Sequence, residues 1–449
     1  MEPKHHEKIF TYIGIAAIAL LLFGLAGWYF FIARQTASLE GASNARGFSI
    51  GIPSFLGGAR GSNAANTAAE SVSGSGSSGS GGASGGQSAF LRFLGIGQGT
   101  GQRAGSDSGA TSTTTGDASR ERKTPRFWRV STTPIAGAAF VSGSTTKLRY
   151  IERTTGNVFD VNPNTGETVR RTNTLTPKVY DALVAAADVI IERTLDESGL
   201  PVTLTGKIGT STEDGVAALA ASNLGEAIRD VATTPSSSDV LLLLPSGGGT
   251  KVVRAGWNGA NAREIAAIPA GDFRILWPSS SQMILAEKAG SGIAGSAYIA
   301  GNPLTPLLRN ILGLLVQVHS SGALLYSSDD GAGLKLFARL PGASDVELPI
   351  PTIADKCVWA PGTGYTAYCA VPQGATGANF LDTWYRGAAH TEDTWYTVTA
   401  GAGTAEKLFT MSESSAIDVE RPVIDGTGSY LAFLNARDKS LWILRISEN

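Results

Sequence analysis

The sequence predicts an all-β fold, a seven-bladed β-propeller of four-stranded antiparallel blades, from a repeated phrase and from the overall composition. The phrase is a β-rich run, a turn of Pro, Gly, Ser or Thr, and a second β-rich run, which is typical of a β-hairpin. It occurs three times between residues 273 and 372, where the anchors Trp277, Val318 and Trp359 follow one another at intervals of 41 residues. A fixed period of that order indicates propeller blades.

Composition favours the same fold class. Charged residues make up 16% of the chain, below the roughly 25% of a typical soluble protein, and glycine accounts for 56 of the 449 residues. Few charges and many turn-forming residues suit a β-rich protein with many hairpins. The formal net charge of −2 gives no electrostatic reason to expect a nucleic-acid partner, because proteins that bind nucleic acid are normally basic.

Four more anchors extend the repeat in both directions, at Phe140, Leu183, Val231 and Ile424. The six successive intervals between the seven anchors are 43, 48, 46, 41, 41 and 65 residues. Seven anchors predict seven blades within residues 126–449. The long last interval predicts an insertion near residues 374–392.

The first predicted blade shows the strand pattern most plainly. Residues 147–152, 157–161 and 168–171 are β-rich runs, and the turns between them carry Thr-Thr-Gly and Asn-Pro-Asn-Thr-Gly. Such runs between Asn, Pro and Gly turns form antiparallel meanders. With the Asp-Gly-Thr-Gly turn at residues 425–428, residues 126–449 resemble the WD-type and Tol-system-type bacterial β-propellers. The resemblance implies the propeller fold and leaves the function open.

The last predicted blade lacks a fourth strand. Residues 127–130 (Phe-Trp-Arg-Val) form a β-rich run with no other predicted role, and we expect them to pair there and close the ring. Two stretches fit the meander poorly. Residues 214–229 predict a short helix, and residues 303–313 predict either a helix or a strand and loop.

Upstream of the propeller, residues 9–33 contain no charged residue and are rich in Ile, Leu, Ala and Phe. As a helix these 25 residues would be roughly 37 Å long, enough to cross a hydrocarbon core of about 30 Å. A cleaved signal peptide is the alternative, although its apolar region normally has only about 7–15 residues. We predict one retained transmembrane helix in contact with lipid, a cytoplasmic head at residues 1–8, and the bulk of the chain outside the cytoplasm.

Residues 34–125 are dominated by Gly, Ser, Thr and Ala, with a Ser-Gly run at 73–82. A segment of this composition buries too little apolar surface to offset the entropy of ordering. We therefore predict a flexible linker between the membrane anchor and the propeller.

Cys357 and Cys369 lie on two predicted strands that flank one turn, so a hairpin would place them across from each other. Outside the cytoplasm we expect a cross-strand disulfide, and two buried thiols are the alternative. His319 and His390 are the histidines of the propeller region, and neither has ligand spacing to the cysteines. We expect no metal site and no cofactor.

The insertion in the long interval is the best candidate for a binding site. It holds an aromatic group made of Trp384, Tyr385, His390, Trp395 and Tyr396. Trp and Tyr are favoured at protein interfaces, and their rings can stack on sugars. The alternative is that the two Trp-Tyr pairs lie on the arms of a hairpin, with half of the rings facing the core.

The sequence shows no catalytic constellation. We therefore predict a non-enzymatic binding or scaffolding module of the cell envelope, with an envelope protein or a surface polymer such as a glycan as partner. The alternative is an envelope hydrolase or lactonase-like enzyme with its site over the propeller channel. That alternative requires acidic side chains that converge there, for instance Asp188, Asp239, Asp355 and Asp425.

Overall fold

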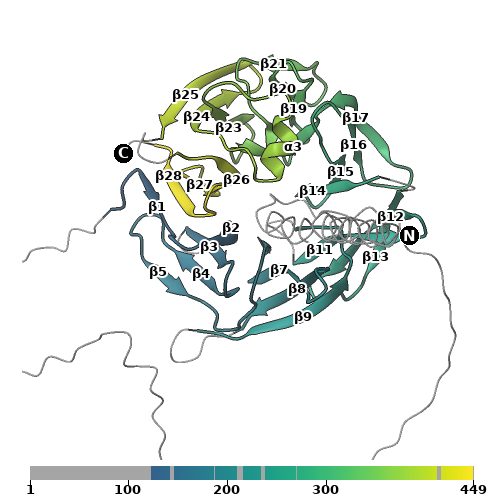
Figure 1. Ribbon diagram of the computed structural model, residues 1–449, viewed down its shortest axis with the longest axis vertical. Coiled ribbons are helices and arrows are strands. Elements are labelled where there is room, and N and C mark those ends of the chain that lie inside the picture. The colour runs from purple at the N-terminus through teal and green to yellow at the C-terminus, as the bar shows by residue number, and fades with distance from the viewer. Residues whose placement is uncertain are drawn as a thin grey trace, which may run out of the picture. The chain divides into compact units, whose positions relative to one another are not determined.

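The computed structural model describes residues 123–141, 146–186, 188–209, 216–233, 238–268, 271–411 and 416–447. These residues form seven four-stranded antiparallel sheets, which follow one another around a ring in chain order (Figure 1). The predicted head, transmembrane helix and linker up to residue 122 lie outside the described residues. In the part of the chain that is described, no helix is long and apolar enough to span a membrane.

The first six blades each take four consecutive strands from the chain. Blades one to three comprise β2 (Ile135–Val141), β3 (Lys147–Glu152), β4 (Val158–Val161) and β5 (Thr168–Arg170), then β6 (Asp181–Val184), β7 (Val189–Leu195), β8 (Pro201–Ile208) and β9 (Leu219–Glu226), then β10 (Asp230–Thr233), β11 (Asp239–Ser246), β12 (Gly249–Gly256) and β13 (Arg263–Ile268).

Blades four to six continue the pattern. They comprise β14 (Phe273–Ser279), β15 (Gln282–Glu287), β16 (Ala294–Ile299) and β17 (Thr305–Leu312), then β18 (Leu315–Val318), β19 (Leu324–Asp329), β20 (Leu334–Arg339) and β21 (Val346–Leu348), then β22 (Cys357–Trp359), β23 (Thr366–Pro372), β24 (Asp393–Thr399) and β25 (Thr404–Thr410). A 3-10 turn, η3 (Ala354–Lys356), precedes β22, and a helix, α3 (Phe380–Tyr385), lies between β23 and β24.

The prediction of seven blades is confirmed. All seven anchors fall in the first strand of their blade, and these first strands lie toward the centre of the ring (Figure 1). The short helix predicted within residues 214–229 is wrong, because β9 pairs with β8 there as the outer strand of blade two. Of the two alternatives for residues 303–313 the strand is correct, since β17 pairs with β16.

The seventh blade is closed by strands from both ends of the domain. It combines β26 (Val419–Ile424), β27 (Tyr430–Asn435) and β28 (Leu441–Arg445) with β1 (Phe127–Arg129), which pairs antiparallel with β28. Phe127 stacks on Trp442 with the ring centroids 4.9 Å apart and also faces Phe409 of blade six at 5.4 Å. The predicted closing strand is therefore confirmed.

The core is divided among the seven interfaces between neighbouring blades. Between the last and the first blade, for example, Leu434 and Ile443 belong to the same buried cluster as Ile135 and Leu148. Because most strands are covered on both faces, they are built from apolar runs such as Val240 to Leu243, all of which are buried. The apolar side chains are thus buried between blades, and polar side chains lie around the axis.

Ring closure predicts a stability effect at Phe127. We expect Phe127→Ala to lower the free energy of unfolding by about 2 kcal/mol, because it removes a half-buried ring that stacks on Trp442 of blade seven and contacts Phe409 of blade six. Denaturant unfolding followed by tryptophan fluorescence measures the change. The control is Val169→Ala in β5, the outer strand of blade one, where the side chain is 44% exposed and we expect a change below about 0.5 kcal/mol. Equal losses at both positions would contradict a special role for β1.

Candidate functional site

Topology sorts the loops of the ring onto two faces. Four antiparallel strands return the chain to the face where it started, so the first strands of all blades begin on one face, here called the top face. The loop between the second and third strands of a blade lies on the top face as well. Hairpins between the first and second strands lie on the opposite face, here called the bottom face. The insertion between β23 and β24 is therefore a top-face feature.

The insertion contains α3 and is anchored in the core. Phe380, Leu381 and Trp384 lie on one side of this helix and are buried in the cluster between blades five and six. A helix of six residues is not stable by itself, so this packing holds it in place. The hairpin arm considered for Trp384 and Tyr385 is wrong, because both residues are helical.

Polar contacts tie α3 to three other parts of the top face. The backbone N–H of Ser291, in the β15–β16 loop of blade four, donates to the Asp382 carboxylate at 3.2 Å. The Tyr385 hydroxyl donates to Asp355 Oδ2 of η3 at 2.7 Å. The Trp384 indole N–H donates to Asp418 Oδ1, just before β26, at 2.9 Å. The insertion is thus fixed to blades four, six and seven.

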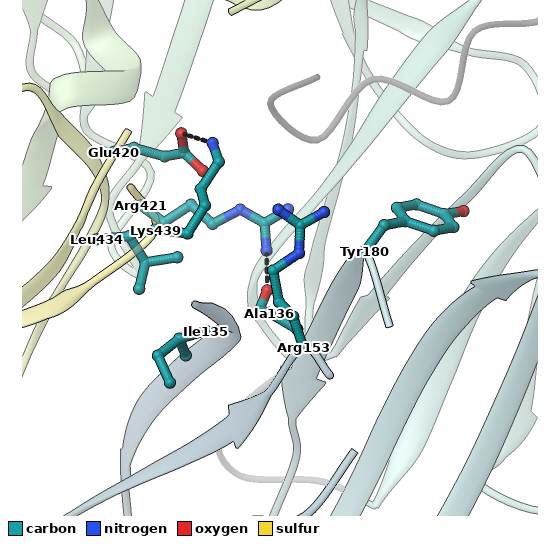
Figure 2. A pocket seen from close by; sticks show the side chains of 8 residues that line it. All are labelled: Ile135, Ala136, Arg153, Tyr180, Glu420, Arg421, Leu434 and Lys439. Carbon is teal, nitrogen blue, oxygen red and sulfur yellow. Dashed lines mark hydrogen bonds and ion pairs between the residues drawn. The ribbon is translucent and has the colours of Figure 1, made fainter. Parts of the chain in front are cut away.

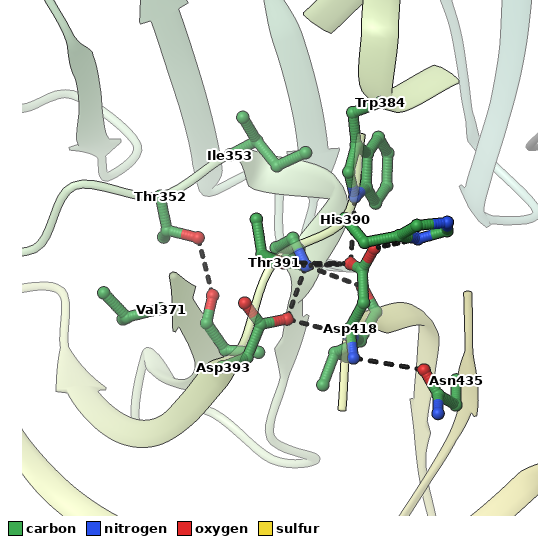
Figure 3. Close-up of polar contacts among 12 residues, drawn as sticks. Thr352, Ile353, Val371, Trp384, His390, Thr391, Asp393, Asp418 and Asn435 are labelled. Carbon is green, nitrogen blue, oxygen red and sulfur yellow. Dashed lines mark hydrogen bonds and ion pairs between the residues drawn. The ribbon is translucent and has the colours of Figure 1, made fainter. Parts of the chain in front are cut away.

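Close to Trp384 of α3, a buried lysine joins two carboxylates from two blades. Figure 3 shows these carboxylates, Asp393 and Asp418. The Lys356 side chain is 0% exposed, and its Nζ donates to Asp393, to Asp418 Oδ1 at 2.7 Å and to Thr391 Oγ1 at 2.9 Å. His390 Nδ1 lies 3.0 Å from the other oxygen of Asp418. Burial raises the pKa of Asp393 above its ordinary value, and the ammonium of Lys356 limits this rise. This network locks the base of the insertion to the start of blade seven.

A second set of charged side chains, here called the axial cluster, gathers around the axis at the top face. Its members come from blades one, two, three, four, six and seven: Arg153, Asp181, Arg193, Asp230, Arg274, Asp355, Glu420 and Arg421. Arg274 Nη1 bonds both oxygens of Asp355 at 3.0 and 2.9 Å. Arg421 Nη1 lies 2.7 Å from Asp181 Oδ1. Each of these ion pairs joins blades that are not neighbours in the ring.

The environment of the axial cluster shifts several pKa values. Burial raises the pKa of Asp181, but Arg421 and Arg193 outweigh it and hold this pKa below the ordinary value. Burial raises the pKa of Asp230, although the Ile275 N–H donates to its carboxylate at 2.8 Å. The pKa of Arg153 is lowered by burial, and the like charge of Arg421 adds to this. The guanidinium groups of Arg153 and Arg421 therefore lie close enough in the cluster to repel each other.

A small pocket opens in this cluster between blades seven, one and two (Figure 2). Figure 2 shows the guanidinium groups of Arg153 and Arg421 next to each other, with the apolar side chains of Ile135 and Leu434 nearby. The pocket lining is Ile135, Ala136, Arg153, Tyr180, Glu420, Arg421, Leu434 and Lys439. The arrangement presents planar cationic donors over a partly apolar floor, which suits recognition of a planar anion.

The predicted aromatic group is mostly internal. Trp384, Tyr385 and Trp395 are 2%, 7% and 0% exposed, so the prediction of an exposed aromatic surface is wrong for these three, whose rings fill the cores between blades. Tyr396 is half-buried, and the His390 side chain is 27% exposed. Binding by the insertion stays a prediction, and it now concerns the exposed residues of that segment.

Cys357 and Cys369 lie directly opposite each other in β22 and β23 and form a disulfide bond. Both residues are buried in the cluster that also holds α3. The bond joins the two inner strands of the blade that carries the insertion.

The four carboxylates named as an example for the hydrolase hypothesis do not converge. Asp355 lies on the top face, whereas Asp188, Asp239 and Asp425 lie at hairpins between first and second strands of three blades, on the bottom face. Asp188 and Asp239 form ion pairs with arginines at 2.6 and 2.7 Å, and Asp425 accepts backbone N–H groups of its own turn. Across the described ranges, no group of three or more His, Cys, Asp or Glu side chains is placed to hold a metal ion.

The axial cluster, apart from Asp355, was not among the predicted site residues, although the sequence contains a signal for it. In five blades a charged residue precedes the anchor by one to four positions: Asp181, Asp230, Arg274, Asp355 and Arg421. A charge at the start of an innermost strand points to the axis, where several blades meet. These charged positions can therefore be found in the sequence once the first strand of each blade is known.

Solved structures of β-propellers resemble the chain in fold. YCF48 bound to D1 peptide is 11% identical with a TM-score of 0.46, over 73% of this chain and 99% of that one. The WD40 domain of Neurospora crassa Pan2 is 12% identical with a TM-score of 0.42, over 70% and 92%. An oligogalacturonate lyase in complex with manganese is 9% identical with a TM-score of 0.44, over 72% and 93%. Neither a protein-family model nor a curated protein matches the sequence. At such low similarity these structures carry no argument about function.

The buried network predicts a pH-dependent stability effect. Lys356→Met leaves Asp393 and Asp418 buried without their ammonium partner, so we expect the free energy of unfolding at pH 7 to fall by about 3–5 kcal/mol. Without the ammonium, the pKa of Asp393 rises further above its unfolded value of 3.8. The folded variant then binds protons more tightly than the unfolded chain, so the loss shrinks as the pH falls toward about 4. Denaturant unfolding at several pH values measures both effects.

The control for this variant is Lys335→Met, which removes a 47% exposed lysine that lies 3.8 Å from Asp330. We expect less than about 0.5 kcal/mol at every pH for this surface pair. A loss at Lys356 that is as small, or that does not change with pH, would show that the buried carboxylates do not depend on the ammonium.

Proposed function

We propose that the propeller is a non-enzymatic binding module that holds a protein partner on its top face, around α3 and the axial cluster. The observation that carries this proposal is the insertion at residues 373–392, which interrupts a meander of mostly short loops and is fixed to blades four, six and seven. Binding residues are concentrated on loops that a rigid scaffold positions. A loop that is anchored this firmly is already ordered before a partner arrives.

Preorganisation supports the proposal energetically. Association costs free energy for every side chain and loop that must be ordered at the interface, and a fixed surface avoids much of that cost. The buried Lys356 network and the apolar side of α3 order the insertion from behind. Asn379 and Arg386 remain exposed on its outer side, where they are available for contact.

We place this module in the cell envelope. Residues 9–33 have the length and composition of a single membrane span, and residues 34–125 have those of a tether. The disulfide between Cys357 and Cys369 supports an oxidising compartment, where such bonds persist. A tethered propeller outside the cytoplasm would scan for a partner near the membrane surface. For the hydrolase alternative, three of the four example carboxylates lie on the bottom face. The carboxylates that do meet at the axis include Asp181 and Asp355, and both form ion pairs with arginines.

Site-specific photocrosslinking in intact cells tests the proposal. A photoreactive phenylalanine replaces the exposed Arg386 at the end of α3, and the full-length protein is recovered through a tag at its C-terminus. We expect crosslinks to one or a few reproducible proteins, because a top-face partner would contact α3. The matched control is the same replacement at Thr363, which is exposed in the bottom-face hairpin of the same blade.

Equal crosslinking from Arg386 and Thr363 would contradict a top-face site. Reproducible crosslinks from Thr363 alone would move the binding surface to the bottom face. If neither position captures a protein, the assignment as a protein-binding module fails.

A further inference from the structure

The pocket of the axial cluster indicates the chemistry of the partner. We propose that Arg153 and Arg421 bind a carboxylate of an acidic peptide segment on the top face of the propeller. This inference rests on the proposed function, because it names the group by which a protein partner would be held. The carboxylate would belong to an Asp or Glu side chain or to a C-terminus.

The two arginines reach the pocket from different blades. Arg153 follows β3 of blade one, and Arg421 lies in β26 of blade seven. Both line the pocket, and Figure 2 shows their guanidinium groups adjacent to each other. Each guanidinium is a planar fork of N–H donors that matches the two oxygens of a carboxylate. Both already have partners, since Arg421 Nη1 donates to the Ala136 carbonyl at 3.0 Å and Arg153 Nε donates to the Val179 carbonyl at 3.3 Å, so a carboxylate would share these arginines with the backbone. A carboxylate placed between them would accept hydrogen bonds from both blades.

The charge of the surroundings favours a bound anion. The cationic groups in and beside the pocket are Arg153, Arg193, Arg421 and Lys439. They face two carboxylates, since Glu420 accepts from Lys439 Nζ at 2.7 Å, and Asp181 lies 2.7 Å from Arg421 and 3.8 Å from Arg193. With the other described members of the axial cluster, Arg274, Asp230 and Asp355, five cationic groups stand beside four carboxylates, so positive charges exceed negative ones by one. A peptide carboxylate would offset that surplus.

The size and lining of the pocket favour a carboxylate over a larger anion. The pocket base has room for about one water-sized group, which a single carboxylate oxygen would fill. Ile135 and Leu434 also line the pocket, but they are 1% and 2% exposed and offer little surface, so the methylene groups of an acidic side chain would stay outside it. A tetrahedral phosphate would bring more oxygens and more negative charge toward Glu420, which lines the same pocket.

The backbone at Arg421 gives independent support. Arg421 has a φ of +51°, in the left-handed region, within a register irregularity between Glu420 and Val423. A non-glycine residue in that region costs of order 1 kcal/mol or more, and bulges beside functional sites commonly redirect a side chain. Here the irregularity turns the guanidinium of Arg421 toward Asp181 and the pocket instead of along the regular strand.

Calorimetric titration of the full-length protein tests the inference. The probes are a glutamate hexamer with acetylated and amidated ends, a glutamine hexamer with the same ends, a glutamine hexamer with a free C-terminus, and inorganic phosphate. We expect the blocked glutamate hexamer to bind and the blocked glutamine hexamer not to bind. Binding of the glutamine hexamer with a free C-terminus would assign the site to terminal carboxylates.

Variants locate the binding site. We expect Arg153→Gln and Arg421→Gln to weaken glutamate-hexamer binding about tenfold or more, and Arg153→Lys to cause a smaller loss because it keeps the charge but not the fork. The matched control is Arg254→Gln, which removes a guanidinium that is 22% exposed and paired with Asp239 on the bottom face. We expect this variant to bind within twofold of the unmodified protein. Thermal melts verify that each variant is folded.

Unchanged binding in folded Arg153→Gln would overturn the inference, and so would equal binding of the two blocked hexamers or a preference for phosphate. Other outcomes test the proposed function separately from the carboxylate site. If the partner still crosslinks at Arg386 when both arginines are replaced, the top-face binding module stands and the carboxylate site does not. If the hexamer binds through the arginines but no protein is captured, the carboxylate site stands without the protein partner.

Discussion

Pairing of β1 with β28 is the constraint on which the rest of the domain depends. A blade has too little core of its own, so each one buries its faces against its two neighbours, as the seven clusters between blades show. An open ring would expose the faces of its first and last blades and leave a sheet edge unpaired. Closure also fixes the distance between blades seven and two, which brings Arg421 to Asp181.

Closure of the ring brings residues that are far apart in the sequence together in one candidate binding site. Because every blade starts on the same face, charges at the starts of five blades meet around one axis, where they form ion pairs between blades that are not neighbours. The insertion of blade six lies on this face and is held from behind by Lys356 and its two carboxylates. The top face thus combines an ordered loop with a cationic pocket, the two elements on which binding of an acidic protein segment would depend.

The fold was predictable from the sequence because each blade repeats the same local pattern of strands and turns. Turn residues and β-rich runs recur in each blade, and residues 127–130 could be matched to the vacant strand of the last blade. The site was less predictable, because it depends on contacts between distant blades. Trp384 and Trp395 are large and aromatic whether they face solvent or core, and only packing showed that both are buried. Local sequence does not distinguish Lys356 from a surface lysine, because its burial depends on Asp393 and Asp418, which are distant in the chain.

Hydrogen exchange measured by mass spectrometry on the partner complex tests the central claim, that the top face is the binding surface, most directly. The complex is isolated from cells through a C-terminal tag and compared with the free full-length protein. We expect slower exchange in the complex at residues 373–392 and 416–421, with bottom-face hairpins such as residues 425–430 unchanged. Slower exchange at the bottom-face hairpins, with the top face unchanged, would contradict this claim.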